Sequence, residues 1–230
     1  MSGATALRIL FQDNHLFVVV KPAGVPVQGD ASETPSLLEM VREHRRVTEQ
    51  KPGNVFVGLV HRLDRAVSGV VVFAKTSKAA SRLSEQFRAR TVDKVYWAAV
   101  EMQRPLASSG GHWRSNLEKD ERTNLVRVVG PGRGLEALTD WKVLSKGTAN
   151  ALLELRPNTG RPHQLRVHCA AAGLPIVGDR RYGAKSLFPD GIALYAVSLS
   201  FDHPTTKERL KFSTPPLGDW KGLGLKLPRL

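Results

Sequence analysis

Apolar residues along the chain gather in short runs of strand length, and polar turn residues separate these runs. The run from Leu16 to Val20 is continuous, which is typical of a strand buried on both faces. The predicted strands lie in residues 8–20 (two strands around a turn at 13–15), 55–63, 69–74, 92–101, 125–129, 138–144 and 151–155.

Three segments have helical spacing and recognisable ends. In the first, Thr34 is placed to cap a helix that begins at Pro35 and ends before Pro52-Gly53. Ser77 is placed to cap a second helix that runs to about Arg90, and a third spans Pro162 to Ala172. Strands outnumber helices and do not alternate with them. The pattern therefore predicts an α+β fold with a mixed, largely antiparallel sheet and flanking helices.

Composition places the chain among ordinary globular proteins. It has 230 residues, of which 41% are hydrophobic and 24% charged, and no apolar run approaches the ~20 residues that span a bilayer. No linker is obvious, so we expect a single domain over residues 1–230, with its core at about 9–215 and a loose basic tail at 221–230. The N-terminus lacks the pattern of a secretory signal. The single cysteine, Cys169, excludes an internal disulfide and fits a reducing compartment such as the cytoplasm.

Charge is unevenly distributed. The formal net charge is +13, and residues 1–60 contribute none of it because they hold six basic and six acidic residues. Residues 61–230 hold 28 basic and 15 acidic residues. Such an excess attracts polyanions, of which nucleic acid is the usual one, although a solvated basic surface would have the same charge.

The densest polar segment is HRLDRAVSG, residues 61–69, between two apolar runs. Its one carboxylate, Asp64, has Arg62 and Arg65 close by, and such neighbours would keep it ionised. An ionised, partly desolvated aspartate can act as a nucleophile or general base. A surface turn with an ion pair would look the same in sequence.

A second polar segment, residues 158–173, carries Arg161, His163 and Arg166 at the predicted start of a helix, where anions bind favourably. His163 and His168 are five residues apart, about 140° around a helix, so they do not form an i, i+4 metal pair. Cys169 precedes an apolar stretch, which favours a buried structural thiol over a nucleophile.

Five strings in order are similar to the RluA-type family of RNA pseudouridine synthases and span about 200 of the 230 residues. They are ILFQDNHLFVVVKPAGVPV (9–27), HRLDRAVSGVVVFAKT (61–76), KVYWAAV (94–100), NTGRPHQLRVHCAAAGLPIVGDRRYG (158–183) and LYAVSLSFDHP (194–204). The resemblance implies a mixed-sheet catalytic domain with a central active-site cleft that isomerises uridine to pseudouridine in ribosomal or transfer RNA. It implies the compact form without an N-terminal S4 domain, and a monomer.

The resemblance also assigns roles to residues. Asp64 matches the catalytic aspartate, Tyr96 the tyrosine that packs on the target uracil, and Arg166 the arginine that pairs with the catalytic carboxylate. Arg62 matches an arginine that, in some relatives, replaces the flipped base. The polar residues expected to contact RNA are His61, Arg62, Arg65, Arg161, His163 and Gln164. Without the resemblance, an aromatic such as Tyr96 in a strand would most often belong to the core.

The chain departs from the family pattern at three places: Ala66-Val67 replaces Asp-Thr, Pro162 replaces Thr, and Tyr195 replaces a frequent His. The first change puts substrate contacts or loop rigidity in doubt but leaves Asp64 in place. The reaction conserves atoms and involves no net redox change, so we expect no cofactor and no metal. Three other functions stay open: a binding protein derived from a synthase, a hydrolase that uses Cys169 or a histidine, and a basic protein of another role.

Overall fold

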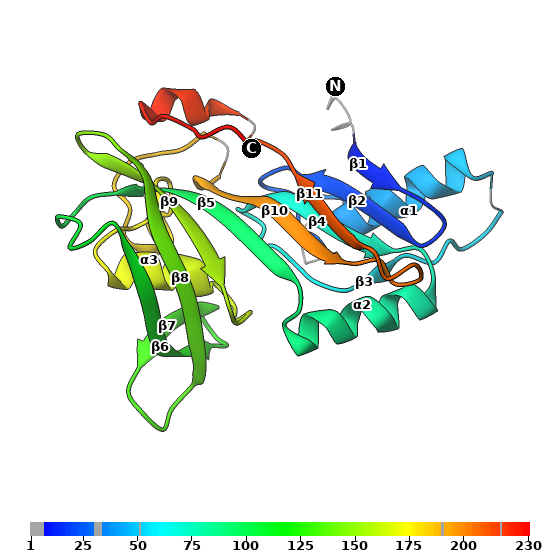
Figure 1. Cartoon of the computed structure of the whole chain (residues 1–230), viewed down its shortest axis with the longest axis horizontal. Coiled ribbons are helices and arrows are strands. Elements are labelled where there is room, and N and C mark those ends of the chain that lie inside the picture. Colours follow the sequence, from blue (N-terminus) through cyan, green and yellow to red (C-terminus); the bar gives the residue numbers. More distant parts are fainter. Residues whose placement is uncertain (1–6, 30–33, 51, 190, 217) are drawn as a thin grey trace. The chain divides into compact units, whose positions relative to one another are not determined.

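The protein is described from a computed structural model that covers residues 7–29, 34–50, 52–189, 191–216 and 218–230 (Figure 1). Its contacts divide the chain into two compact units. The first unit comprises residues 1–93 and 198–214, and the second comprises residues 94–197 and 215–230. The chain therefore passes between the units three times, at residues 93–94, 197–198 and 214–215.

The first unit is built on a small antiparallel sheet flanked by helices. Its elements are β1 (Arg8–Gln12), β2 (Leu16–Lys21), α1 (Leu37–Thr48), β3 (Gly58–Leu59), β4 (Ser68–Ala74), α2 (Ser77–Ala89), the end of β10 (Leu194–Asp202) and β11 (Arg209–Ser213). β2 pairs with both β1 and β4, β3 pairs with β4, and β10 pairs with β11, all antiparallel. The predicted strands at residues 8–20 and 69–74 are confirmed.

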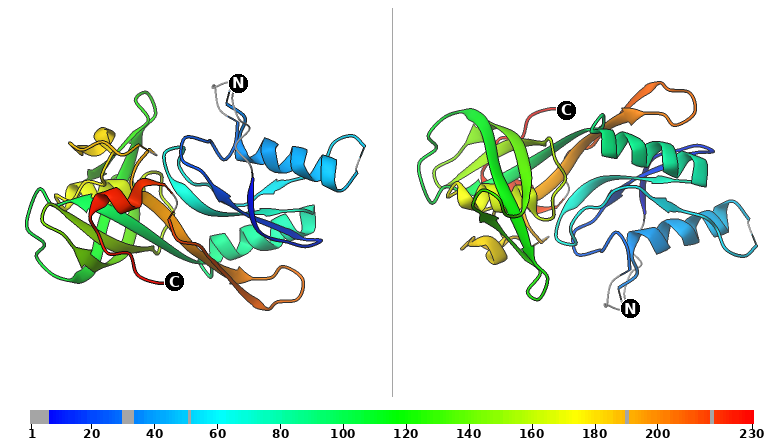
Figure 2. Two further views of the ribbon diagram at one scale, coloured as in Figure 1. Left: turned by 90° about the horizontal axis from the view of Figure 1, so that it is seen from above. Right: turned by 90° about the horizontal axis from the view of Figure 1, so that it is seen from below.

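All six residues of β2 are buried because helices cover both faces of the strand. On one face, Ala79 and Leu83 of α2 join a core cluster with Val18 and Val72. On the other face, the ring of Phe17 packs edge-on against His44 of α1. Figure 2 shows the strands of this unit running between the two helices. The continuous apolar run in the sequence therefore corresponds to a strand with no solvated face.

The first helix begins two residues later than the sequence predicts. Ser36, not Thr34, is the N-cap, and it forms a capping box in which Glu39 accepts from the backbone N–H of Ser36. The helix ends at Thr48, before Pro52-Gly53. Ser36 is fully buried and Thr34 exposed. The prediction weighed the proline signal above the Ser–Glu pair, which satisfies two backbone donors at once.

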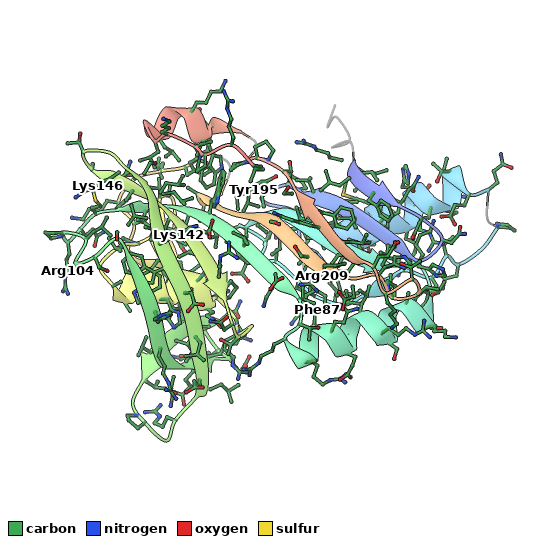
Figure 3. The ribbon with its side chains drawn as sticks, in the orientation of Figure 1. Phe87, Arg104, Lys142, Lys146, Tyr195 and Arg209 are labelled. Carbon is green, nitrogen blue, oxygen red and sulfur yellow. The ribbon has the colours of Figure 1, made fainter. Side chains whose placement is uncertain are left out.

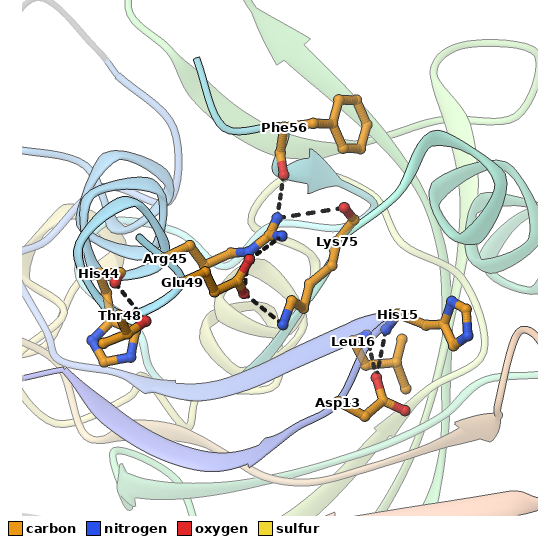
Figure 4. A network of polar contacts seen from close by, with 9 residues as sticks. All are labelled: Asp13, His15, Leu16, His44, Arg45, Thr48, Glu49, Phe56 and Lys75. Atoms are coloured by element: carbon orange, nitrogen blue, oxygen red, sulfur yellow. Dashed lines mark hydrogen bonds and ion pairs between the residues drawn. The ribbon is translucent and has the colours of Figure 1, made fainter. Parts of the chain in front are cut away.

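A buried arginine connects the C-terminal end of α1 to the segment that follows this helix (Figure 4). Arg45 is 3% exposed and donates to both carboxylate oxygens of Glu49 and to the carbonyl of Phe56. Lys75, just after β4, pairs with the same carboxylate at 2.7 Å. The irregular segment before β3 is thus held by polar contacts. This fits the finding that only Gly58–Leu59 of the predicted strand at 55–63 is a strand.

The second unit contains a five-stranded antiparallel sheet in the order β5-β9-β8-β6-β7. Its elements are β5 (Asp93–Glu101), β6 (Gly110–Asp120), β7 (Leu125–Val129), β8 (Leu135–Lys146), β9 (Asn150–Pro157), α3 (Gln164–Ala171), η1 (Arg180–Tyr182), the start of β10 and η2 (Asp219–Leu223). α3 lies against the sheet through Val167, which packs on Leu117, Val126 and Ala137. Together the two units confirm the predicted α+β class.

The strand β6 was not predicted from the sequence. Its string, GGHWRSNLEKD, is mostly polar, and Leu117 is the only buried residue of this strand. Trp113 of β6 stacks on Trp141 of β8 with ring centres 5.0 Å apart. This strand is therefore specified by its pairing with β7 and β8 more than by its own hydrophobicity.

The C-terminal segment is anchored by one aromatic side chain. Trp220, within η2, is 2% exposed and packs edge-on against Phe188 and Tyr195. Residues 221–223 complete this short helix, and the described residues after it have no regular structure. None of the helices formed by the described residues has the length and hydropathy of a transmembrane segment.

Candidate active site

Asp64 begins a tight turn in the first unit. Its carbonyl accepts a hydrogen bond from the N–H of Val67 at 3.0 Å. Leu63 and Val67 on either side are 7% and 3% exposed, so the turn is fastened to the core at both ends. Asp64 is half-buried, whereas Arg62 and Arg65 are exposed. The sequence prediction of a polar loop held between two apolar segments is confirmed.

A buried lysine fastens this turn to the loop that follows β2. Lys21 is fully buried, and its Nζ donates to the carbonyls of Pro22 and Val25, each at 2.8 Å, and of Arg65 at 3.0 Å. Gly24 N–H donates to the carbonyl of Arg65, and Arg65 Nε donates to the carbonyl of Gly24, both at 2.8 Å. The backbone next to Asp64 is therefore held by main-chain acceptors in two loops.

Lys21 is also electrostatically linked to Asp64. Burial lowers the pKa of Lys21 from its ordinary value of 10.5 to about 7, while the negative charge of Asp64 opposes this shift. The positive charge of Arg65 adds to the lowering. The charge of Asp64 thus favours the charged form of the Lys21 amine.

His61 is held by the elements that follow the turn. Its ring stacks on Phe87 of α2, with ring centres 4.6 Å apart, and its Nε2 accepts the N–H of Val72 at 3.1 Å. Phe87 is labelled in Figure 3. Because Nε2 accepts a hydrogen bond, the imidazole is in the neutral form with its proton on Nδ1. His61 therefore has a structural role that the sequence did not reveal.

Tyr96 lies in the second unit, on β5, where it pairs with Leu155 of β9. Its side chain is half-buried, whereas the next residue, Trp97, is 3% exposed. Successive residues of a strand point to opposite faces, so Tyr96 and Trp97 face different surroundings. The tyrosine is therefore not a fully buried core aromatic.

Arg166, on α3, forms a buried ion pair within the second unit. Its Nε and one terminal nitrogen donate to the two carboxylate oxygens of Asp179 at 2.7 and 2.8 Å. Arg166 is 6% exposed and Asp179 only 1%. The sequence prediction for Arg166 did not include Asp179 as a partner. The available signal was an aspartate directly after the apolar run LPIVG, a position where a charge needs a buried partner.

The N-cap of α3, His163, has a left-handed backbone conformation with φ of 51° and ψ of 17°. Its Nδ1 lies 2.7 Å from the phenol oxygen of Tyr182 in η1. The same oxygen accepts the N–H of Val126 at 3.0 Å. The ring of Tyr182 packs against the guanidinium of Arg166, with Cζ 4.9 Å from the ring centre. His163 and Arg166, predicted to belong to one site, are thus joined through Tyr182.

Gln164, the first residue of α3, is 4% exposed and uses both ends of its amide within the protein. Its Oε1 contacts Thr159 Oγ1 at 2.7 Å and accepts the N–H of Arg161 at 3.0 Å. Its Nε2 donates to the carbonyl of Leu138 and to Thr139 Oγ1. These bonds fix the loop before α3 onto β8. They show a structural role for Gln164 that was not visible in the sequence.

His168 and Cys169, further along α3, face the interior. His168 Nδ1 and Nε2 lie 2.9 Å from the hydroxyls of Thr139 and Ser115, and burial lowers the pKa of this imidazole from 6.5 to about 4. Cys169 is fully buried, and burial raises the pKa of its thiol. A protonated, inaccessible thiol is a poor nucleophile, which argues against a hydrolase that uses Cys169. Within the described ranges, no three His, Cys, Asp or Glu side chains are grouped as metal ligands.

Comparison with known proteins agrees with the motifs. The family model described as RNA pseudouridylate synthase matches residues 15–171, which include Asp64, Tyr96 and Arg166. The chain belongs to the RNA pseudouridylate synthase family. It is 34% identical over 220 residues to the uncharacterized RNA pseudouridine synthase YhcT of Bacillus subtilis, covering 94% of this chain and 71% of that protein.

Two further similarities support this membership. Ribosomal large subunit pseudouridine synthase C of Vibrio parahaemolyticus is 34% identical over 221 residues, which cover 90% of this chain. Only 65% of that relative's length is matched. Among solved structures, human RNA pseudouridylate synthase domain containing 4 superposes with a TM-score of 0.77 at 27% identity, covering 96% of this chain and 95% of that one.

Two of the departures from the family pattern have a visible structural setting. Val67, in place of the usual threonine, is 3% exposed and closes the Asp64 turn as an apolar anchor. Tyr195, in place of a frequent histidine, is fully buried, with its ring 6.4 Å from that of Trp220. Both substitutions therefore place more apolar surface in the interior than the usual residues would.

Proposed function

We propose that the protein isomerises uridine to pseudouridine within RNA and that Asp64 initiates the reaction. The observation that carries this proposal is the match of the synthase family model across residues 15–171, with Asp64 in a turn fastened by Lys21 and by the neighbouring backbone. A carboxylate on a rigid turn between buried anchors keeps one position, which suits it to act on a bound substrate.

The chemistry needs a carboxylate but no redox partner. The bond between N1 of uracil and C1′ of ribose breaks, and a bond between C5 and C1′ forms. C5 loses its proton and N1 gains one, so atoms balance. Asp64 either attacks the substrate as a nucleophile or removes a ribose proton to give a glycal intermediate. Both routes need the ionised carboxylate.

The other predicted site residues have complementary roles in this proposal. Tyr96 stacks on the detached uracil while the base rotates. Arg166 supplies a positive charge that acts on the reacting carboxylate. Arg62 fills the vacancy left by the flipped base, which offsets part of the unstacking cost of a few kcal/mol. Exposed Arg65 and half-buried Arg161 contact RNA phosphates. His61, His163 and Gln164 hold in place the segments that carry the RNA-binding arginines.

For the substrate we propose ribosomal RNA, because two of the similar proteins are named ribosomal large subunit pseudouridine synthases, C in Vibrio parahaemolyticus and D in Xylella fastidiosa. The net charge of +13 suits any structured RNA, so transfer RNA is the second outcome of the test. We further propose that the protein acts as a monomer in the cytoplasm. Light scattering of the purified protein checks the first point, and fractionation of cells checks the second.

The deciding experiment is chemical mapping of pseudouridine in total RNA from cells with and without the gene. We expect one or a few discrete sites to disappear and to return when the wild-type gene is restored. Asp64→Asn should not restore them, because the neutral amide can neither attack nor accept a proton; we expect its turnover in vitro to fall at least about a thousandfold.

A matched control is Asp120→Asn, which makes the same chemical change at the last residue of β6 in the second unit. It should restore the sites fully. RNA binding by Asp64→Asn should stay within a few-fold of wild type. Normal turnover of purified Asp64→Asn on the mapped RNA would sink the proposal, and RNA binding without product by the wild type would favour the binding-protein alternative.

A further inference from the structure

Tyr182 lies where three elements of the second unit meet. Its phenol oxygen accepts the N–H of Val126 on β7 and lies 2.7 Å from Nδ1 of His163, at the N-cap of α3. Its ring lies under the guanidinium of Arg166 on α3. No motif of the sequence assigned this tyrosine a function. Its three polar or cationic contacts join η1 to β7 and to the start of α3.

The guanidinium of Arg166 is restrained from two directions. Asp179 takes two of its nitrogens in a bidentate pair, which restrains the group within its own plane. The face of the Tyr182 ring, whose centre lies 4.9 Å from Cζ, makes a second contact with the group. A guanidinium held by both contacts keeps one orientation, which a long and otherwise flexible side chain would not do.

The backbone beside this arginine is strained in a way that needs support. His163 is not a glycine, yet its φ is 51°, and such a residue persists only where its surroundings hold it. The phenol of Tyr182 is one of those supports. Burial raises the pKa of this phenol, so it stays protonated at neutral pH and can donate to Nδ1 of His163 while accepting from Val126.

From this geometry we infer that Tyr182 is a positioning residue for Arg166: its ring sets the orientation of the guanidinium, and its hydroxyl holds the strained start of α3. The inference rests on the proposed function, because the role of Arg166 in catalysis is part of that proposal. It adds a residue that acts through Arg166 without contacting the RNA.

Two substitutions distinguish the contribution of the Tyr182 ring from that of its hydroxyl. Tyr182→Leu removes both, and we expect kcat to fall about tenfold or more, with KM changed less than about threefold, because a misplaced charge weakens the transition state more than it weakens RNA binding. Tyr182→Phe keeps the ring over Arg166, and its kcat should recover to within about threefold of wild type. An equal loss of kcat in the two variants would assign the effect to the hydroxyl and overturn the role of the ring.

A double-mutant cycle tests whether Tyr182 acts through Arg166. In an Arg166→Met background the guanidinium is gone, so Tyr182→Leu should reduce kcat by less than about twofold further. If the kcat losses of the two single variants multiply in full in the double variant, Tyr182 acts independently of Arg166 and the inference is wrong.

Leu117→Ala is the control for a general loss of packing, because Leu117 belongs to the small core on which Tyr182 packs. It should lower the midpoint of urea unfolding at least as much as Tyr182→Leu while leaving kcat within about twofold of wild type. If it reduces kcat as strongly as Tyr182→Leu does, stability explains the effect and positioning does not.

A measurement on the folded protein without RNA separates this inference from the proposed function. The Nε–H proton of Arg166 is bonded to a buried carboxylate, so its NMR signal should be resolved and slow to exchange in the wild type. In Tyr182→Leu it should exchange at least about tenfold faster, whatever reaction the protein catalyses. Unchanged exchange would overturn the inference, whereas a wild type that makes no pseudouridine would overturn only the proposed function.

Discussion

The turn around Asp64 and the start of α3 around Arg166 are held in different ways. At Asp64, the bonds end on main-chain carbonyls, which Lys21 Nζ and the N–H groups of Gly24 and Val67 reach. At Arg166, they join side chains, namely the carboxylate of Asp179 and the ring of Tyr182. The first arrangement fixes a backbone and the second fixes a charged group.

This difference teaches which substitutions each region can accept. A main-chain acceptor is present whatever side chain its residue carries, so Ala66-Val67 can replace the usual Asp-Thr without breaking a bond that holds the turn. A side-chain network loses a contact with each substitution. We therefore expect the Arg166 region to be the more sensitive of the two to single changes.

We expect the largest loss of stability from Asp179→Asn, which tests how much the Arg166 region depends on its side-chain contacts. It removes the negative charge of Asp179 from the buried pair with Arg166, and breaking a buried pair in this way typically costs about 3–5 kcal/mol of the free energy of unfolding. Urea denaturation measures the loss. Asp120→Asn breaks the exposed pair with Arg127 and should lower the free energy of unfolding far less than Asp179→Asn does. Similar losses in the two variants would contradict a special role for the buried pair.

The second effect is the loss of folding stability in acid that His168 of α3 causes. The pKa of His168 is about 4 in the folded protein and 6.5 in the unfolded chain, so between these values the unfolded state binds more protons. Folding stability is therefore lost as pH falls from 6.5 to 4, by up to about 3 kcal/mol from this group. Urea denaturation of wild type and His168→Gln across this range measures it. A slope unchanged by the substitution would contradict the assignment.

The third and smallest effect concerns the Asp64 turn. The pKa of Lys21 is about 7 when folded and 10.5 when unfolded, so the buried charge weakens the fold below pH 7 and the penalty declines as pH rises towards 10.5. We expect the free energy of unfolding of wild type, relative to Lys21→Met, to increase by about 2 kcal/mol from pH 7 to 9.

The activity of Lys21→Met sharpens the comparison further. Because the bonds between Gly24 and Arg65 and between Asp64 and Val67 remain, kcat should fall less than about tenfold, less than in Tyr182→Leu. Steady-state kinetics on the mapped RNA measures both variants. A larger loss in Lys21→Met would reverse the proposed order of sensitivity. A difference in stability that stays constant with pH would contradict the burial of a titrating amine.

Much of the architecture could be predicted from hydrophobic periodicity. The apolar runs located β1, β2, β4, β5, β7, β8 and β9, and the position of Cys169 before an apolar stretch predicted a buried thiol. The polar segments that contain Asp64 and Arg166 were likewise visible, because ionisable residues between apolar runs are exceptional. The strand β6 escaped prediction because most of its residues are polar and its pairing partners lie elsewhere in the chain.

What only the tertiary structure decided is the identity of the partners. The sequence alone determined that Arg166 lies near the start of a helix, within a conspicuous set of polar residues, but Asp179 and Tyr182 reach it through a turn 13 and 16 residues further on. Likewise, nothing local marks Lys21 as buried or directs its amine to the carbonyl of Arg65, 44 residues away. Periodicity is a property of neighbouring residues, whereas the choice of a charge's partner depends on which distant groups the fold excludes from water together.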